Sequence, residues 1–318
     1  MNLLISGGFG FIGGYLLPYL LGKDVHVGLI ARRVPATFQE IAKRVDLHIH
    51  DLSEPASLRL SRQYDAYIDL AGAPHSVASA SGDPISRTLA VTRHCLDVCR
   101  ANYIPRFIYC STFQVYGRDH GFVDENTPVV CRNDYARAHH LSEEMVREAH
   151  REGGLDYAIL RPTNGYGFSP FTDVHRWSLV PSCFCRTAVE QQEIVLQTSG
   201  HQQKDFIHLE HVASLIYGIC ASFDRFKNQP INLASGSSQA IIDVARLVQE
   251  VYGRTVGGSS ALRVLSDDPL PAEPLVVSAA KTAGLPYTPS GDRSLAGEIA
   301  KTLAFLTSGH RPSLAQHI

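Results

Sequence analysis

Short apolar runs alternate with amphipathic stretches through the first half of the chain. Six apolar runs have the length of buried strands, and they cover residues 2–6, 25–31, 46–50, 66–71, 107–111 and 157–161. Four stretches between them have helical periodicity, at residues 11–21, 38–44, 87–101 and 135–151. Strands that alternate with helices in this way build a parallel sheet covered on both faces. The pattern therefore predicts an α/β fold with a doubly wound parallel sheet.

The alternation becomes looser after residue 167. Residues 168–177, 199–203 and 266–274 have the composition of loops. We expect a smaller, less regular C-terminal lobe whose segments are interleaved with the last elements of the sheet. The predicted division is a sheet domain at residues 1–166 and 204–235, and a substrate lobe at residues 167–203 and 236–318.

The composition is that of a globular protein, and it excludes several classes of function. The 318 residues are 44% hydrophobic and 19% charged, with a formal net charge of −2. A general nucleic-acid binder or a polybasic membrane module would need a basic excess. No run of about 18 apolar residues is present, and the apolar start of the chain lacks the basic leader of a signal peptide. We therefore expect a soluble, cytoplasmic protein without nucleic-acid or membrane partners.

The seven cysteines fit the same compartment. They are odd in number and mostly lie in apolar segments, which predicts buried, reduced thiols. Cys183 and Cys185 are separated by one residue, not by the two of a zinc or redox pair, so no metal site is predicted.

A glycine-rich loop joins the first predicted strand to the first predicted helix. Its sequence is Gly7-Gly8-Phe9-Gly10-Phe11-Ile12-Gly13. The glycines at positions 7, 10 and 13 allow backbone angles and close approaches that a side chain would block, and they let a pyrophosphate rest on the helix amides. Glycine turns are common between strands and helices, but this one opens a strand–helix alternation. The loop predicts a dinucleotide site with contacts from Gly7, Gly10, Phe11, Ile12 and Gly13.

The residues after the second and third predicted strands bear on the kind of dinucleotide. Arg32 and Arg33 stand about 20 residues beyond the loop, where NAD-binding proteins usually carry an acid. Two guanidinium groups suit the 2′-phosphate of NADP, so NADP(H) is favoured and NAD(H) stays possible. Solvated arginines at a strand end are the alternative. Asp51 and Leu52 are expected beside the adenine, although Asp51 equally suits a cap on the next segment.

These segments and several further motifs resemble the extended short-chain dehydrogenase/reductase family of nucleotide-sugar epimerases, dehydratases and ketoreductases. The motifs follow one another over most of the chain: the glycine loop, Ala71-Gly72-Ala73, Ser111-Thr112-Phe113-Gln114-Val115-Tyr116-Gly117, Tyr135, Arg161-Pro162-Thr163-Asn164 and Lys204-Asp205-Phe206-Ile207-His208. The resemblance implies a Rossmann-type sheet with a smaller substrate lobe. It also implies further cofactor contacts, from Ala71, Gly72, Ala73, Tyr135, His139 and Pro162.

The resemblance implies a reacting group made of a hydroxyl residue, a tyrosine and the residue four positions after the tyrosine. Thr112 matches the hydroxyl that steadies the substrate oxygen, and Tyr135 matches the general acid/base. The third position is His139, where the family has lysine. Three consequences are open: a protonated His139 donates to the ribose and still lowers the tyrosine pKa, the positive nicotinamide takes over part of that electrostatic role, or the chain binds cofactor with little turnover. An ordinary buried helix aromatic is the alternative for Tyr135.

Phe113 and Gln114 limit the choice of reaction. Family 4,6-dehydratases have Asp-Glu at the matching positions, the acid and base for water loss, so dehydration is not expected here. The arginine pair favours a 4-ketoreductase acting on a nucleoside-diphosphate deoxysugar. The alternatives are a nucleotide-sugar 4-epimerase with tightly bound NAD, a non-catalytic NAD(P)-binding relative, and a reductase of a non-sugar carbonyl.

Four residues are predicted to contact the nucleotide sugar. Asn164 and Lys204 match family positions near the diphosphate, where a lysine neutralises phosphate charge. His75 and Gln114 are expected at the sugar, with a solvated loop position as the alternative for His75.

Apolar positions on the predicted helices 87–101 and 135–151 favour a homodimer. The helices pair across a dimer in the family, although part of this apolar surface must face the sheet. The positions are Leu89, Leu96, Val98, Leu141 and Met145.

Overall fold

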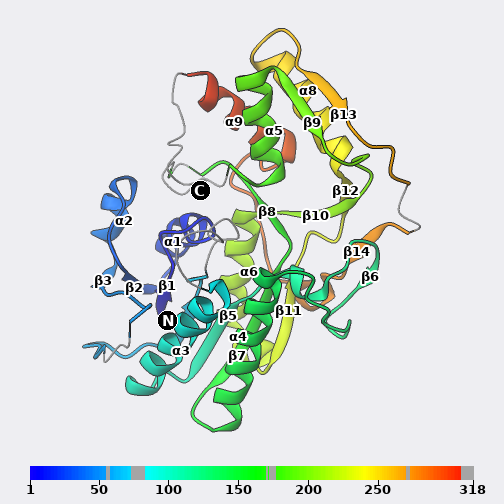
Figure 1. Ribbon diagram of the computed structural model, residues 1–318. Helices are drawn as coiled ribbons and strands as arrows, with labels where there is room; N and C mark the ends of the chain where they lie inside the picture. The colour runs from blue at the N-terminus through cyan, green and yellow to red at the C-terminus, as the bar shows by residue number, and fades with distance from the viewer. Residues whose placement is uncertain (55–57, 73–82, 170, 172–176, 270–272, 309–318) are drawn as a thin grey trace.

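The computed structural model describes the whole chain except residues 55–57, 73–82, 170, 172–176, 270–272 and 309–318. Its centre is a seven-stranded sheet in the order β11-β7-β5-β4-β1-β2-β3 (Figure 1). All neighbouring strands in this sheet are parallel, which confirms the predicted fold class. The strands are β1 (Asn2–Ser6), β2 (His26–Ala31), β3 (Asp46–Ile49), β4 (Ala66–Asp69), β5 (Arg106–Cys110), β7 (Asp156–Pro162) and β11 (Gln229–Leu233).

The central strand β1 is apolar on both of its faces. Leu3, Leu4 and Ile5 are fully buried. Because side chains alternate along a strand, Leu3 and Ile5 join the core on one face of the sheet, and Leu4 joins the core on the other. The strand order reverses between β1 and β4, and in such sheets ligands bind beyond the carboxyl ends of the strands at this point.

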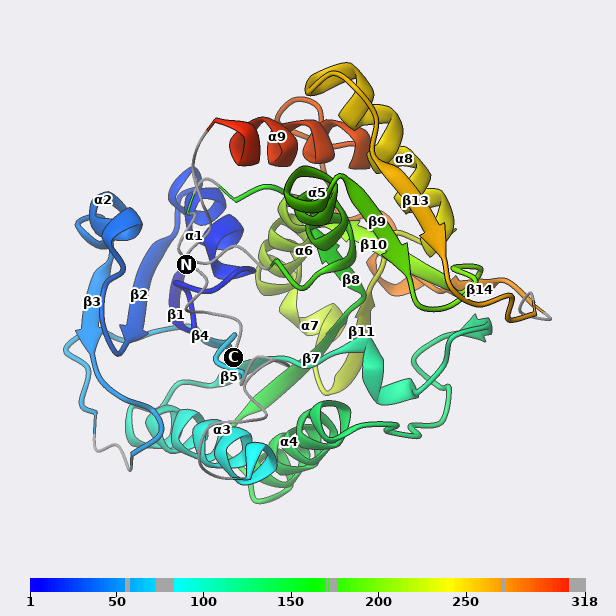
Figure 2. The same ribbon diagram turned by 45° about the horizontal axis from the view of Figure 1, so that its top comes forward.

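Two layers of helices cover the sheet, as Figure 2 shows. One face carries α1 (Gly13–Leu21) and α6 (Leu209–Ala221), and the other carries α3 (Pro84–Ala101) and α4 (Asp134–Arg151). The third helix begins three residues before the predicted start. The reason is Asp83, which accepts hydrogen bonds from the amides of Ile85 and Ser86 and so caps the helix, while Pro84 suits its first turn.

The predicted helix at residues 38–44 is a much shorter turn. It consists of η1 (Ala36–Phe38) and α2 (Gln39–Ala42). None of the α2 residues is buried, so no apolar face extends the helix by packing. Other short elements are η2 (Phe113–Tyr116), α7 (Phe223–Phe226) and η4 (Ala280–Thr282).

The smaller lobe has its own apolar core. Its helices are α5 (Val180–Gln191), α8 (Ile241–Thr255) and α9 (Leu295–Thr307), which pack on one another beside the parallel pair β9 (Glu193–Leu196) and β13 (Ala261–Val264). Between the lobe and the main sheet lie the three-stranded sheet of β8 (Asn164–Tyr166), β10 (Gln203–His208) and β12 (Ser238–Ala240), and the pair β6 (Gly121–Val123) and β14 (Leu275–Val277). Sequence segments therefore alternate between the two parts.

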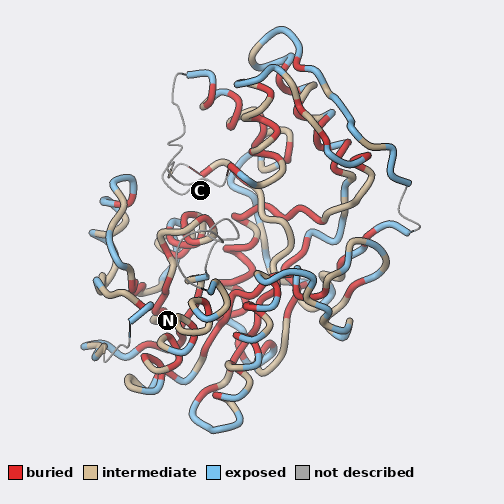
Figure 3. Tube along the Cα trace, viewed as in Figure 1, coloured by how far each residue is buried: buried red, intermediate tan, exposed pale blue. Residues whose placement is uncertain are grey.

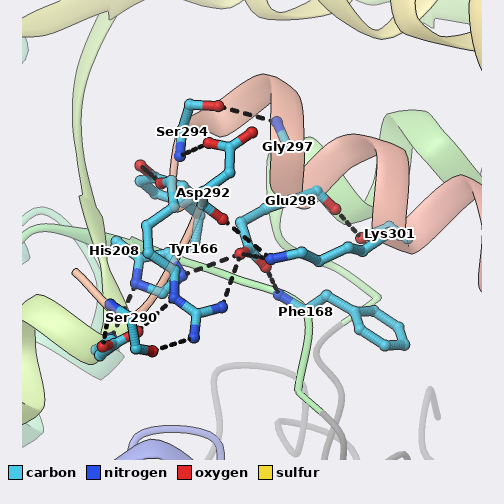
Figure 4. Close-up of polar contacts among 12 residues, drawn as sticks. Tyr166, Phe168, His208, Ser290, Asp292, Ser294, Gly297, Glu298 and Lys301 are labelled. Atoms are coloured by element: carbon cyan, nitrogen blue, oxygen red, sulfur yellow. Dashed lines mark hydrogen bonds and ion pairs between the residues drawn. The ribbon is translucent and has the colours of Figure 1, made fainter.

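A buried carboxylate ties α9 to the end of β10 (Figure 4). Glu298 is 3% exposed and accepts hydrogen bonds from the Phe168 amide (2.6 Å) and from Lys301 (2.7 Å). His208 lies 3.5 Å and Arg293 3.4 Å from the same carboxylate. Burial alone would raise the pKa of Glu298, but the hydrogen bonds from these neighbours lower it to about 2. The carboxylate is therefore charged and paired at neutral pH.

Buried positions follow the sheet and the inner faces of the helices (Figure 3). Leu96 and Val98 lie in the core beneath α3 and are not available to a partner, which corrects their assignment to a dimer face. Leu141 on α4 is 40% exposed. The homodimer itself stays a prediction.

All seven cysteines are free thiols, and five of them are buried. Within the part of the chain that the structure describes, no helix combines the length and the apolar character needed to cross a bilayer.

Candidate functional site

The glycine loop makes two close approaches that only glycine allows. Gly7 has a φ of +68°, and a Cβ atom there would lie 2.5 Å from the carbonyl of Leu70, beyond the end of β4. A Cβ atom on Gly13 would lie 2.1 Å from the Gly8 carbonyl oxygen. The first turn of α1 has no side-chain cap, and the positive end of the helix dipole there favours an anionic group. This cradle fits the pyrophosphate of a dinucleotide.

The two apolar residues of the loop support it from within the fold. Phe11 is buried in the core under α1, and Ile12 packs against the same core. These two residues can therefore contact a cofactor only through their backbone atoms or through the exposed part of Ile12.

The predicted adenosine residues lie at the carboxyl ends of β2 and β3. Arg32 and Arg33 are both exposed directly after β2. Asp51 accepts hydrogen bonds from the Ser53 amide (2.9 Å) and hydroxyl (2.8 Å), and these bonds together with the charge of Arg32 lower its pKa. Asp51 thus forms a local turn after β3, beside Arg32.

Leu52 belongs to the apolar core next to α3. It is 7% exposed, and its carbonyl oxygen lies 2.9 Å from Nδ1 of His94. This carbonyl contact fixes the backbone that follows β3.

Tyr135 and His139 lie one turn apart at the start of α4. Asn133 caps this helix by accepting a hydrogen bond from the Ala136 amide (2.8 Å). The two aromatic rings meet edge to face, with centroids 4.6 Å apart. Thr112 is buried beyond the end of β5, where its hydroxyl accepts a hydrogen bond from the Gln114 amide (3.2 Å) and caps η2.

His139 is buried and uncharged at neutral pH. It is 4% exposed, and its Nδ1 atom lies 2.8 Å from the hydroxyl of Tyr109 on β5. Burial lowers the pKa of His139 to about 4, against a smaller opposing effect of Glu143. The structure therefore does not support the prediction of a protonated His139 that replaces the lysine charge.

The other edge of the His139 ring faces the segment after β4. A Cβ atom on Gly72 would lie 3.4 Å from Cε1 and 3.6 Å from Nε2 of His139. The structure thus brings Gly72, Tyr135 and His139 together beyond the carboxyl ends of β4 and β5. Ala73 and His75 fall outside the described residues.

A buried carboxylate that the sequence analysis missed holds the Ala71–Gly72 segment. Asp69 ends β4 and accepts hydrogen bonds from the Ser6 hydroxyl (2.7 Å) and the Ala71 amide (2.9 Å). Burial raises the pKa of Asp69 to about 6. Because this carboxylate turns the chain, β4 ends two residues before the predicted strand end.

A second missed carboxylate anchors α4 to the sheet. Glu143 is fully buried and accepts hydrogen bonds from the Ser111 hydroxyl (2.6 Å) and from Arg161 (2.9 and 2.5 Å). Arg161 in turn lies over the ring of Tyr116. Arg161 inside the apolar strand β7 was the available sequence signal, but nothing in the spacing pairs it with Glu143 on the largely polar helix α4.

The predicted substrate residues fall into two groups. Asn164 and Lys204 lie on the adjoining strands β8 and β10, where Asn164 is in register with Phe206 and donates to the Asp205 carbonyl (2.9 Å). Lys204 and Phe206 are two residues apart on β10, so their side chains share a face of this sheet. Asn164, which pairs with Phe206, lies on the same face. Gln114 accepts a hydrogen bond from Asn133 (3.2 Å) at the start of α4, next to Tyr135. Pro162, which was predicted as a cofactor contact, lies at the end of β7 and pairs with Leu233 of β11.

Comparison with known proteins agrees with this arrangement. The NAD dependent epimerase/dehydratase family model matches residues 3–234. The chain belongs to this family. It is a family of NAD-dependent enzymes, which confirms the predicted family and enzyme class.

The similar curated proteins and solved structures are distant. UDP-glucuronic acid decarboxylase 3 of Arabidopsis thaliana is 23% identical over 296 residues, which cover 89% of this chain and 84% of that protein. The Low-salt glycan biosynthesis protein Agl12 of Haloferax volcanii is 25% identical over 301 residues, covering 91% and 94%. The UDP-glucuronic acid 4-epimerase of Bacillus cereus, crystallised with NAD, has a TM-score of 0.79 at 20% identity and covers 97% of this chain and 99% of that chain. The NDP-hexosamine 5,6-dehydratase TunA has a TM-score of 0.74 at 22% identity, covering 97% and 98%.

Proposed function

We propose that this chain transfers a hydride between a nicotinamide cofactor and a sugar carbon of a nucleotide sugar, as a 4-ketoreductase of a nucleoside-diphosphate deoxysugar. The substrate class is supported by the similar proteins, among them a UDP-glucuronic acid decarboxylase, a UDP-glucuronic acid 4-epimerase and an NDP-hexosamine 5,6-dehydratase.

The observation that supports a reductase is the neutral, buried His139 beside Tyr135. A cation next to a tyrosine stabilises the tyrosinate, which is the base needed to oxidise a hydroxyl. A neutral imidazole supplies no such charge and so favours the phenol, which is a proton donor. Reduction of a ketone needs a proton donor at the oxygen, and Tyr135 fits that need.

Each part of the proposed site has one role. The glycine loop and the start of α1 hold the pyrophosphate, and the bound nicotinamide supplies the hydride. Tyr135 donates its proton to the carbonyl oxygen of the sugar, so that the ketone becomes a hydroxyl and the phenol is restored from solvent. Thr112 steadies the same oxygen, while Lys204 and Asn164 face the diphosphate.

The structure offers no acid–base pair for water loss at the two positions after Thr112. Phe113 is buried and apolar. The side-chain carbonyl oxygen of Gln114 accepts a hydrogen bond from Asn133. Neither side chain ionises, so dehydration stays outside the proposal.

NADP(H) is the proposed cofactor because Arg32 and Arg33 stand where the adenosine ribose would lie. The second candidate function is a 4-epimerase with tightly bound NAD. The epimerase is favoured by the family, whose members are NAD-dependent epimerases and dehydratases, and by a similar epimerase structure that contains NAD. Decarboxylation of a uronic-acid nucleotide is supported in the same way by the similarity to UDP-glucuronic acid decarboxylase 3.

The test begins with the cofactor that co-purifies with the protein and continues with a panel of 4-keto nucleotide sugars. The proposal expects NADPH-dependent reduction of at least one of them, and a loss of about a hundredfold or more in kcat for Tyr135→Phe. Tyr252→Phe is the matched control, because Tyr252 is a buried tyrosine in the other lobe, on α8.

Interconversion of UDP-sugars with tightly bound NAD, without net oxidation of NADPH, would establish the epimerase instead. Tight cofactor binding without any turnover would establish a non-catalytic relative, and reduction of phenolic ketones alone would exclude the sugar substrate.

A further inference from the structure

We propose that Tyr109 is a positioning residue that fixes His139 as the neutral tautomer with its proton on Nε2, so that His139 acts as an uncharged hydrogen-bond donor beside Gly72. This inference rests on the proposed function, because it assigns His139 a task in the same site. It explains how a histidine serves at a position where the family has lysine.

The contact between the two residues is direct and buried. Tyr109 is 3% exposed on β5, and its hydroxyl lies 2.8 Å from Nδ1 of His139. The tautomer of a histidine is set by the hydrogen bond that the other ring nitrogen makes. A phenol that donates to Nδ1 therefore leaves the proton on Nε2.

A chain of buried hydroxyls gives the phenol proton its direction. Thr92 on α3 donates to Ser142 on α4 (3.0 Å), and Ser142 forms a hydrogen bond with the oxygen of Tyr109. Thr92 is 1% and Ser142 0% exposed. When the hydroxyl of Ser142 accepts from Thr92, its own hydrogen is directed to the Tyr109 oxygen, and the Tyr109 hydrogen goes to the imidazole, the strongest acceptor in the chain.

The carboxylates around His139 do not take the place of the phenol. Glu143 lies one turn farther along α4, but its oxygens already accept from Ser111, Arg161 and Arg147. Asp69 on β4 is engaged by Ser6 and the Ala71 amide. A carboxylate at Nδ1 would favour the imidazolium, whereas a phenol favours the neutral ring.

The proton on Nε2 lies at the edge of the ring that faces Gly72. A Cβ atom on Gly72 would lie 3.6 Å from Nε2, so it is the backbone of Gly72, without a side chain, that lies against this edge. The group that the Nε2–H suits is an uncharged oxygen acceptor, such as a ribose or sugar hydroxyl. Lysine at this position would supply a charge as well as a donor, and His139 supplies the donor alone.

The test is nitrogen NMR of the full chain with ¹⁵N-labelled histidine, free of substrate, with the His139 signals assigned by their loss in His139→Gln. At pH 7 we expect the Nε2–H tautomer, and in Tyr109→Phe a mixture of both neutral tautomers. Tyr67→Phe is the control, because Tyr67 is equally buried on the neighbouring strand β4, where it stacks on Phe107. It should leave the His139 signals unchanged.

Kinetics give the second readout. Tyr109→Phe should lower kcat by about tenfold with little change in KM for the sugar, as expected for the loss of one orienting hydrogen bond. His139→Gln keeps an uncharged donor and should retain more activity than His139→Leu. An imidazolium or an Nδ1–H tautomer in the unaltered protein would overturn the inference, and so would an unchanged tautomer in Tyr109→Phe. If the NMR result holds but no substrate is reduced, the proposed function fails while the assignment of Tyr109 stands.

Discussion

His139 presents its imidazole to the ring of Tyr135 edge to face, with the ring centroids 4.6 Å apart on successive turns of α4. The hydroxyl of Tyr109 forms a hydrogen bond with Nδ1 of the same imidazole. The proton donor of the proposed reaction thus has a neutral neighbour with a fixed orientation. This relationship separates the site from one built around a lysine.

His139→Lys should move the pH optimum for oxidation of the 4-hydroxyl sugar to lower pH. An ammonium group beside Tyr135 lowers the tyrosine pKa, so the tyrosinate that accepts the hydroxyl proton forms at lower pH. The measurement is kcat for each direction as a function of pH. His140→Lys serves as the control, because the next residue of a helix points about 100° away. An unchanged pH profile in His139→Lys would argue against a missing charge at this position.

His139 should also weaken the fold in mild acid. Its pKa is about 4 in the folded chain and about 6.5 when unfolded, so the unfolded state binds the extra proton between these values. The free energy of unfolding should therefore fall as the pH drops from about 6.5 to 4. His139→Gln should lack this part of the loss, as measured by urea unfolding at pH 7, 5.5 and 4.5. Parallel curves for the two proteins across this range would contradict a neutral, buried His139.

Glu298→Gln should destabilise the chain by about 3 kcal/mol at pH 7, because it leaves Lys301, Arg293 and His208 facing a neutral amide. The pKa of Glu298 is held at about 2, below its ordinary 4.5, so its contribution is present above pH 4.5 and is lost as the pH falls toward 2. Thermal or urea unfolding at several pH values measures the difference. Glu250→Gln, which alters an exposed pair with Arg254 on α8, should cost less than about 1 kcal/mol. Equal losses in the two variants would deny Glu298 its role in joining α9 to β10.

Arg32→Ser combined with Arg33→Ser should weaken NADPH binding by about tenfold to a hundredfold and leave NADH binding nearly unchanged. The two guanidinium groups are proposed to face the 2′-phosphate, which NADH lacks. Cofactor titration by fluorescence gives both dissociation constants. Arg246→Ser, on the exposed face of α8, controls for a general loss of positive charge. A matching loss for NADH and NADPH would place the arginines at the pyrophosphate or outside the site.

Much of the sheet was predictable because its central strands are apolar on both faces and the turn after β1 has local chemistry. Leu3, Leu4 and Ile5 define β1 without reference to any distant residue, and Gly7 and Gly13 mark the loop that follows. The ends of elements were less predictable. They depend on single side chains such as Asp83 and Asp69, whose hydrogen bonds form only when the chain is folded.

The chemistry of the site was predictable only in part. Tyr135 and His139 are four residues apart, so one helix places them together. Tyr109 reaches His139 across 30 residues, and the burial that makes the imidazole neutral comes from the packing of α4 on the sheet. The Glu143–Arg161 pair likewise depends on tertiary packing, since a glutamate on a helix gives no sign of the strand it will face.

The central claim is that a hydride passes from the cofactor to a sugar carbon while Tyr135 supplies the proton. The most direct measurement uses NADPH deuterated at the transferred position, together with the panel of 4-keto nucleotide sugars, and follows the label by mass spectrometry and NMR. The account predicts one deuterium on the reduced sugar carbon for each NADP formed, and loss of this transfer in Tyr135→Phe. Folded protein with bound cofactor that places no deuterium on any sugar of the panel would contradict it.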